Sequence, residues 1–397
     1  MQNGLLTTFL AAGFACGTCF AQTAPPAPAS DFKPATSNQA GKEYPQVTSD
    51  GRVRARVVAA GAQTVLLDIG GVKYPMAKGE DGAWIGDSNP QDEGFHYYQL
   101  VIDGAEVPDP GSLYFYGASR WGSGVEVPAK DQDFYSLKNV PHGQVREQLY
   151  FSKSNNAMRR CFVYTPPEYD RDTTRRYPVL YLQHGGGEDE TGWPSQGKTN
   201  LIMDNLIAER KATPFIIVMD NGTWRMPGGP ARPPRQGERP AGPWPPAGWA
   251  DGFKKTLLED VIPMIDANYR TLADQPHRAM AGLSMGGMQT RVISLASPDT
   301  FSNIGIFSGG SISAEDVAGA PGFKEKVKLL FVSFGSRELE RRAGDNRPNF
   351  GGDPKANTSA LEAAGFNAHF YVSPDTAHEW QTWRRSLYQF AQRAFKD

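Results

Sequence analysis

The sequence predicts a doubly wound α/β domain that follows a small β-sandwich. From residue 146 to residue 397, continuous apolar runs alternate with stretches of helical periodicity, as in a parallel sheet covered on both faces. Between residues 44 and 128, short apolar runs are separated by Asp-Gly or Gly-Gly turns, as in a sandwich of immunoglobulin-like size. The length of 397 residues leaves room for both domains.

The composition excludes several classes of function. The formal net charge of -2 leaves no basic excess for nucleic acid to bind. A mean hydropathy of -0.48 argues against a protein with several membrane spans. Binding of nucleic acid or another polyanion is therefore not expected, and the composition does not indicate an oligomeric state.

The amino terminus resembles a secretory signal. The apolar run Leu5 to Phe20 is too short to span a bilayer, and Ala21 precedes a cleavage position of the expected small-residue type. Residues 1–21 are therefore predicted to direct the protein to the periplasm or the medium, although no Lys or Arg precedes the run, and a buried helix is the alternative. Loss of this segment would leave Cys161 as the one cysteine, so neither an intrachain disulfide nor a cysteine-based zinc site is expected.

The boundaries of the predicted domains follow the composition. Residues 22–43 are rich in Ala, Pro, Ser and Asn, which predicts a disordered linker. In the predicted sandwich, residues 44–128, Val53, Ala55 and Val57 alternate with arginines, which indicates a strand with one wet face. Residues 129–145 form a second, polar linker, and residues 146–397 form the α/β domain.

Aromatic strands within the sandwich resemble the family 48 carbohydrate-binding modules. The resemblance rests on Gly82-Ala83-Trp84, the run Phe95 to Gly104, and Asp109-Pro110. Exposed aromatic rings in such modules would bind glycans, whereas packing in the core is the alternative for each ring.

Six apolar runs predict the central strands of the α/β domain, and four helices are predicted between or after them. The runs are Val179 to Leu182, Phe215 to Met219, Arg278 to Ala281, Ile304 to Phe307, Leu329 to Phe334 and His369 to Val372. The helices are Asn200 to Arg210, Phe253 to Asn268, Gly287 to Ala296 and Trp383 to Phe395.

A nucleophile motif follows the third of these strands. Gly282-Leu283-Ser284-Met285-Gly286 is a G-x-S-x-G sequence between a strand and a helix, the setting of the nucleophile elbow of α/β-hydrolases. Ser284 is the predicted nucleophile. Because a serine hydroxyl is weakly nucleophilic at neutral pH, the motif requires a base and a group that orients the base.

In α/β-hydrolases the acid and the base follow the nucleophile in the chain, each on a loop after a strand, so both are expected beyond Ser284. His378 lies on such a loop and is the predicted general base, whereas His369 lies within a strand. Glu338 is the first carboxylate after the preceding strand and is the predicted acid. Its competitors on the same polar stretch are Glu340, Asp345 and Asp353.

A glycine-rich turn, His184-Gly185-Gly186-Gly187, follows the first central strand. It resembles the H-G-G-G loops that supply an N–H group to the oxyanion hole, and the N–H of Met285 would be the second donor. No G-x-x-x-x-G-K-[ST] pattern accompanies it, which argues against a phosphate site.

A Pro- and Gly-rich insert spans residues 224–249 at the edge where α/β sites lie. Trp224, Trp244 or Trp249 is predicted to stack on an aromatic acyl group or a sugar, and a disordered surface loop is the alternative. Trp380 and Trp383 are predicted to pack the last helix onto the sheet.

Together these motifs resemble carbohydrate esterase family 1, the group of esterase D, feruloyl esterases and acetylxylan esterases. The residues that carry the resemblance include Gly282 to Gly287, Phe307-Ser308-Gly309-Gly310, and His378-Glu379-Trp380-Gln381-Thr382-Trp383-Arg384. It implies a catalytic triad of Ser284, His378 and Glu338, although the acid of the family is often Asp, and oxyanion donors at Met285 and Gly186.

The resemblance implies a secreted serine esterase that acts on feruloyl or acetyl esters of plant polysaccharide such as xylan, with no metal or organic cofactor. Two alternatives stay open: an esterase of siderophores of the enterochelin type, and a carbohydrate-binding protein that has lost catalysis.

Overall fold

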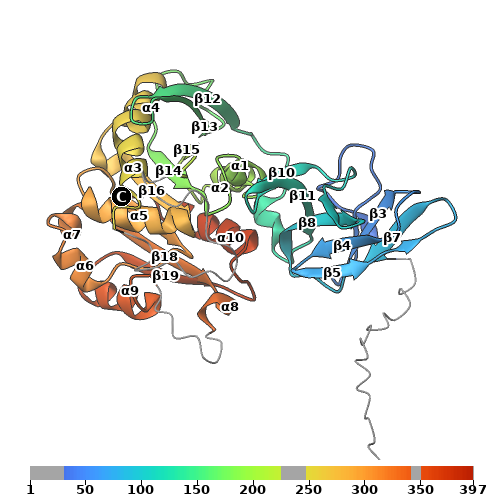
Figure 1. Ribbon diagram of the computed structural model, residues 1–397. Coiled ribbons are helices and arrows are strands. Elements are labelled where there is room, and N and C mark those ends of the chain that lie inside the picture. The colour runs from blue at the N-terminus through green and yellow to red at the C-terminus, as the bar shows by residue number, and fades with distance from the viewer. Residues whose placement is uncertain (1–30, 225–246, 341–349, 397) are drawn as a thin grey trace, which may run out of the picture.

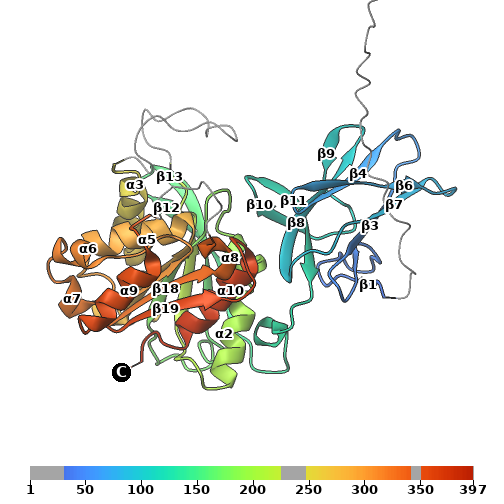
Figure 2. The ribbon, with the colours of Figure 1, turned by 90° about the horizontal axis from the view of Figure 1, so that it is seen from below.

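The chain forms a β-sandwich and an α/β domain that lie side by side (Figures 1 and 2). The structure is a computed structural model, and it describes residues 31–224, 247–340 and 350–396. The predicted signal, residues 1–21, lies outside this range, and so does most of the insert that follows Trp224. Within the described residues, none of the helices combines the length and the apolar character that a membrane span requires.

Two sheets form the sandwich. One has the order β1-β2-β3-β7-β6, and the other has the order β10-β11-β8-β4-β5 with β9 beside β8. The side chains of Val53, Ala55 and Val57 are buried and the arginines between them are partly exposed, which confirms the predicted alternation. The strands are β1 (Lys33–Pro34), β2 (Gln46–Val47), β3 (Val53–Val58), β4 (Val65–Ile69), β5 (Val72–Pro75), β6 (Ala77–Lys78), β7 (Ala83–Asp87), β8 (Gly94–Ile102), β9 (Ala105–Val107), β10 (Tyr114–Gly117) and β11 (Arg120–Val127).

The sandwich begins earlier than the sequence predicts. The expected disordered linker over residues 22–43 is wrong for residues 31–43, because β1 pairs antiparallel with β2 and Ala35 donates its N–H to Pro45 O at 2.9 Å. Backbone hydrogen bonds order this segment, so its shortage of aliphatic side chains was misleading.

The second predicted linker, residues 129–145, is packed structure as well. It contains the 3-10 helix η1 (Gln132–Tyr135), and the side chains of Ala129 and Tyr135 are buried. The first strand of the α/β domain begins within it, at Gln144.

The α/β domain is built on an eight-stranded sheet with the order β12-β13-β15-β14-β16-β17-β18-β19. β12 and β13 pair antiparallel and β13 joins β15 antiparallel, while every pairing from β15 to β19 is parallel. The carboxyl ends of the parallel strands therefore share one edge. The strands are β12 (Gln144–Ser152), β13 (Ala157–Thr165), β14 (Val179–Gln183), β15 (Ile216–Asp220), β16 (Arg278–Leu283), β17 (Asn303–Phe307), β18 (Leu329–Gly335) and β19 (Ala368–Ser373).

Helices cover both faces of this sheet, as the continuous apolar runs predict. In β14, Val179 and Tyr181 pack in one core layer, and Leu180 and Leu182 pack in the other. The first layer lies under α3 (Asp251–Lys255), the π-helical turn η2 (Thr256–Val261), α4 (Ile262–Asn268), α5 (Met285–Ala296), α7 (Phe323–Lys326) and α9 (Pro354–Ala363). The second lies under α1 (Gly192–Ser195), α2 (Thr199–Ala208) and α10 (Trp380–Ala391). The other short helices of the described residues are the 3-10 helix η3 (Gln275–His277), α6 (Ala314–Ala318) and α8 (Ser336–Leu339).

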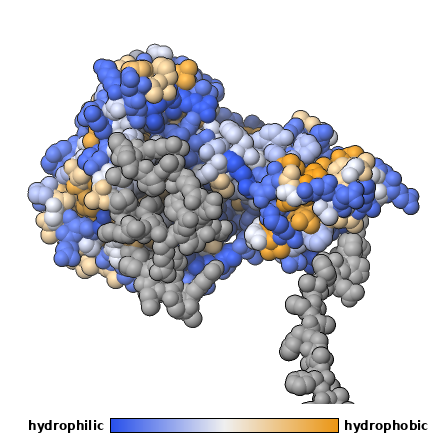
Figure 3. Space-filling model, viewed as in Figure 1, coloured by the Kyte–Doolittle hydropathy of each residue, from blue (hydrophilic) through white to orange (hydrophobic). Residues whose placement is uncertain are grey.

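The side of the α/β domain that carries α1 and α10 faces the sandwich (Figures 1 and 2). Arg384 of α10 is fully buried there and makes a two-pronged ion pair with Glu126 of β11, at 2.6 and 2.9 Å. Far from this contact, exposed apolar side chains gather on the β12–β13 hairpin (Figure 3), namely Val145, Leu149, Phe151 and Met158.

Candidate active site

Ser284 occupies a sharp turn between β16 and α5. Its backbone adopts φ 52° and ψ −116°, a conformation that non-glycine residues rarely take. A Cβ added at Gly282 would lie 2.5 Å from the backbone carbon of Gly286, and one added at Gly286 would lie 2.6 Å from His184 O. Both glycines are therefore required by close backbone contact, which explains the G-x-S-x-G spacing in physical terms.

The structure brings together the three residues predicted as nucleophile, base and acid. The Ser284 hydroxyl lies 2.9 Å from Nε2 of His378, and Nδ1 of His378 lies 2.7 Å from Oε1 of Glu338. His378 stands on the loop between β19 and α10 with half of its side chain exposed, whereas Glu338 in α8 is 11% exposed. This is the hydrogen-bonded order that an activated serine requires.

The competing residues have other surroundings. Asp353 caps α9 by accepting the N–H groups of Lys355 and Ala356, and His369 bonds Asn367 on the surface. Glu340 is exposed, and Asp345 lies outside the described residues.

Ser308 supports the acid and was not assigned a role from the sequence. Its hydroxyl donates to Oε2 of Glu338 at 2.7 Å, and the Gly335 N–H donates to the same oxygen at 2.7 Å. The Trp383 indole N–H donates to Ser308 Oγ at 3.1 Å. The sequence offered one indication of this role, because Ser308 directly follows a buried strand at the edge of the sheet where Ser284 lies.

The glycine-rich turn after β14 lies against Ser284. A Cβ at Gly185 would lie 3.2 Å from the Cβ of Ser284, and Gly186 beside it is exposed. Met285 begins α5, so its N–H belongs to the helix terminus, where N–H groups have no partner inside the helix. Backbone on both sides of Ser284 is thus available to an oxyanion, and the assignment of Gly186 and Met285 as its donors stays a prediction.

His184 shapes this turn. Its Nδ1 lies 2.8 Å from Gly185 O, and its Nε2 accepts the N–H of Gly222 at 3.0 Å. Burial lowers the pKa of His184, which keeps the ring neutral and allows one nitrogen to donate while the other accepts.

The predicted rim tryptophans are only partly described. Trp224 is half-buried, its ring lies against Gly252 of α3, and it packs on the core layer beneath that helix. Trp249 is half-buried just before α3, and Trp244 lies outside the described residues. Stacking of any of the three on a substrate stays a prediction.

Trp380 and Trp383 are buried and lie edge to face at 5.3 Å, which confirms their predicted packing role.

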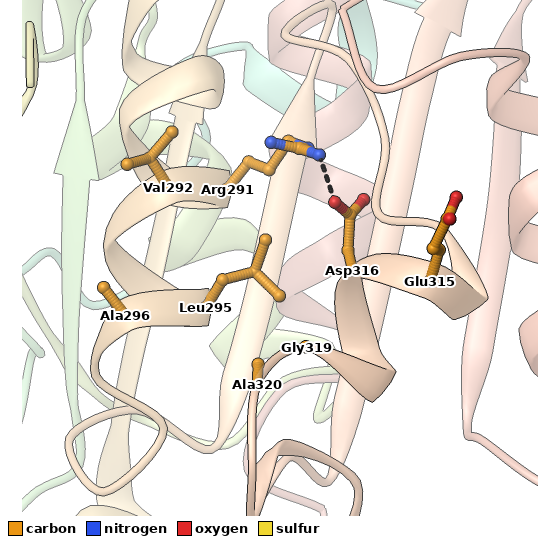
Figure 4. Close-up of a pocket in the computed structure, with 8 residues that line it drawn as sticks. All are labelled: Arg291, Val292, Leu295, Ala296, Glu315, Asp316, Gly319 and Ala320. Carbon is orange, nitrogen blue, oxygen red and sulfur yellow. Dashed lines mark hydrogen bonds and ion pairs between the residues drawn. The ribbon is translucent and has the colours of Figure 1, made fainter. Parts of the chain in front are cut away.

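A surface hollow between α5 and α6 is separate from this cluster. Arg291, Leu295 and Glu315 are among the residues that line it, and Arg291 pairs with Asp316 across it (Figure 4). Ser284, His378 and Glu338 are not among the residues that line it. In the described ranges no group of three or more His, Cys, Asp or Glu side chains is placed to hold a metal ion.

Comparison with known proteins gives concordant results. The model of the Esterase family matches residues 152–394. An endo-1,4-beta-xylanase/feruloyl esterase of Xylanibacter ruminicola is 43% identical over 377 residues, which are 93% of this chain and 48% of that protein. Endo-1,4-beta-xylanase Y of Acetivibrio thermocellus is 25% identical over 318 residues, 72% of this chain and 26% of that protein. The chain therefore spans half or less of the length of these curated relatives.

Two solved structures share the fold at low sequence identity. A ferulic acid esterase of Anaeromyces mucronatus, solved with ferulic acid, has a TM-score of 0.54 and 22% identity, covering 67% of this chain and 96% of that one. The enterobactin esterase of Shigella flexneri has a TM-score of 0.57 and 15% identity, covering 86% and 92%. These likenesses and the strand order confirm the predicted α/β-hydrolase fold.

Proposed function

This chain belongs to the Esterase family, and we propose that it is a serine carboxylesterase that hydrolyses feruloyl or acetyl esters on xylan. The observation that carries the proposal is the continuous hydrogen-bonded chain from Ser284 through His378 to Glu338. Such a chain activates the serine hydroxyl as a nucleophile, and beside the N-terminus of a helix this arrangement suits acyl transfer.

In the proposed mechanism, Ser284 Oγ attacks the ester carbonyl while Nε2 of His378 removes the hydroxyl proton. Glu338 holds the imidazole in the tautomer with the proton on Nδ1 and stabilises the imidazolium. The N–H groups of Met285 and Gly186 bind the oxyanion, and loss of one such donor typically costs about 10² to 10³ in rate.

The intermediate collapses when His378 passes its proton to the leaving sugar oxygen, which leaves an acyl-Ser284. A water molecule then gives a proton to His378 and attacks the acyl carbon. The second tetrahedral intermediate expels Ser284 Oγ, which regains its proton from His378, and the free acid is released. Each residue ends in its starting protonation state.

The substrate class is proposed from the relative named as a xylanase/feruloyl esterase, because its similarity extends over both domains of this chain. Hydrolysis of a catecholate siderophore is the second candidate. It is favoured by the two-domain coverage of the enterobactin esterase, but an identity of 15% supports the fold alone.

Glycan binding by the sandwich and export by residues 1–21 stay part of the proposal. Tyr114 and Trp121 are about half exposed, at 51% and 54%, which suits a surface that stacks on sugar rings. Trp84 and Tyr98 are buried in the sandwich core instead.

The test compares Ser284→Ala with the wild type on methyl ferulate, acetylated xylan and a catecholate siderophore. We expect turnover of the preferred ester to fall by at least about 10⁴-fold, because the nucleophile is lost while the fold persists. Ser313→Ala, at the N-cap of α6, is the matched control and should keep its activity. Equal turnover in Ser284→Ala and the wild type would refute the mechanism, and the ranking of the three substrates decides the class.

A further inference from the structure

A hairpin of the sandwich rests on the glycine-rich turn beside Ser284. The β10–β11 hairpin closes at the pair Gly117 and Arg120, with Ala118 and Ser119 at its tip. Both tip residues have positive φ, at 51° and 65°, as the tightest hairpin turns require. The Ser119 N–H donates to Gly187 O at 2.8 Å, so a backbone bond links the two domains at this turn.

One residue further along the turn, the side chain of Glu188 is held by the sandwich. The hydroxyl of Tyr97, in β8, lies 2.9 Å from both carboxyl oxygens of Glu188. The same hydroxyl accepts the Gln196 side-chain N–H at 2.6 Å and the Trp380 indole N–H at 3.2 Å. A phenolic hydroxyl has one proton and two lone pairs, so all its capacity is used.

The partners of Tyr97 come from three parts of the site. Glu188 follows the glycine-rich turn, Gln196 follows α1, and Trp380 begins the helix two residues after His378. We propose that the sandwich is part of the catalytic unit, in which Tyr97 is a positioning residue that holds residues 185–188 against Ser284 through Glu188. This inference deepens the proposed function and rests on it.

The protonation of Tyr97 suits this role. Burial, with the charge of Glu188 as the second cause, raises the pKa of the Tyr97 hydroxyl well above its ordinary value. The hydroxyl therefore keeps its proton at neutral pH and can donate it to the Glu188 carboxyl group.

The sandwich is also fixed to the segments that carry the acid and the base. Arg337, next to Glu338, pairs with Asp92 of the sandwich at 2.8 Å. Arg384, in the helix that follows His378, pairs with Glu126 as described above. Because all three loops are tied to the same domain, a displacement of the glycine-rich turn relative to Ser284 is resisted by the sandwich as a whole.

Loss of the Tyr97 hydroxyl leaves one carboxyl group and two N–H donors without their shared partner. Residues 185–188 then gain freedom, and an N–H group in this turn spends less time where the oxyanion forms. Since the oxyanion exists in the transition state and not in the bound ester, the cost falls on kcat and hardly on KM.

The experiment compares Tyr97→Phe with Tyr98→Phe. Tyr98 is the next residue of β8, and its buried hydroxyl donates to a carboxylate, Asp109, at 2.8 Å, but within the sandwich core. The control thus removes the same kind of bond from the same strand and leaves the turn untouched. Two readouts are used: steady-state hydrolysis of methyl ferulate and hydrogen exchange of the backbone amides of residues 185–188.

We expect Tyr97→Phe to lower kcat by about 10-fold to 100-fold while KM stays within about twofold, and to speed the exchange of these amides. Tyr98→Phe should change neither. Equal kcat in the two variants, or equal exchange, would overturn the inference. If the wild type hydrolyses no ester, the proposed function fails on its own, and the exchange comparison still decides whether Tyr97 holds the turn.

Discussion

The ion pair between Arg384 and Glu126 offers a sharp test of how strongly the two domains are joined. Arg384 has no exposed surface, and its guanidinium makes three bonds: two to the Glu126 carboxylate at 2.6 and 2.9 Å, and one to Gln196 O at 2.7 Å. Glu126→Gln keeps the size of the side chain but removes the negative charge. The buried cation then lacks its counter-ion, and one N–H of the new amide meets a guanidinium N–H.

The expected cost follows from the burial. Removing one partner of a buried ion pair typically lowers the free energy of unfolding by about 3 to 5 kcal/mol, because an uncompensated charge stays away from water. Asp87→Asn is the matched control, since Asp87 also makes a two-pronged pair, with Arg54 at 2.7 and 2.8 Å, but both side chains are partly exposed. We expect the control to cost about 1 kcal/mol.

Urea unfolding followed by tryptophan fluorescence measures both variants. We expect the urea concentration at the unfolding midpoint to be clearly lower for Glu126→Gln than for Asp87→Asn. A loss for Glu126→Gln no larger than that for Asp87→Asn would refute the reasoning, because it would mean that Arg384 reaches water or finds another partner.

Two further predictions concern carboxyl groups near Ser284. Glu338→Gln should lower kcat by about 10⁴-fold, because the amide cannot hold His378 in the required tautomer, whereas Glu340→Gln on the same segment should keep kcat; equal losses would point to a different acid. Burial raises the pKa of Glu188 from 4.5 to about 7, so the folded state holds this proton more tightly than the unfolded chain, and stability falls as the pH rises from 4.5 to 7. Glu188→Gln removes this dependence, so its stability relative to the wild type should rise by about 3 kcal/mol between pH 4.5 and pH 8; a difference that is flat with pH would contradict the assignment.

Local patterns predicted the parts of the site that depend on neighbouring residues. The turn around Ser284 needs Gly282 because of its contact with Gly286, four residues along, so a short motif reports it directly, whereas Gly286 is required by its contact with the distant His184. His378 and Glu338 were found by a rule of chain order, in which each follows the strand that brings it to the shared edge. The apolar runs located the strands because both faces of a parallel sheet are covered.

The sequence failed where order depends on distant partners. Tyr97 and Glu188 are 91 residues apart, and Tyr97 and Trp380 are 283 residues apart, so no periodicity connects them. The segment before Tyr44 is ordered by strand pairing through its backbone, which composition does not report. Ser308 is an intermediate case. Its position after a strand could be predicted from the sequence, but its hydrogen bond to Glu338 could not.

In the segment that begins at His378, the structure explains the roles of Trp380, Trp383 and Arg384. Trp383 and Arg384 follow Trp380 by three and four residues, so each lies beside it on the same side of α10. Trp380 bonds the Tyr97 hydroxyl, Trp383 bonds the serine that supports the acid, and Arg384 binds the sandwich glutamate. The helix therefore couples the histidine loop to both the acid and the neighbouring domain. Removal of the sandwich would expose a charged arginine and a tryptophan that are now buried, so the α/β domain is not expected to be a self-sufficient catalyst.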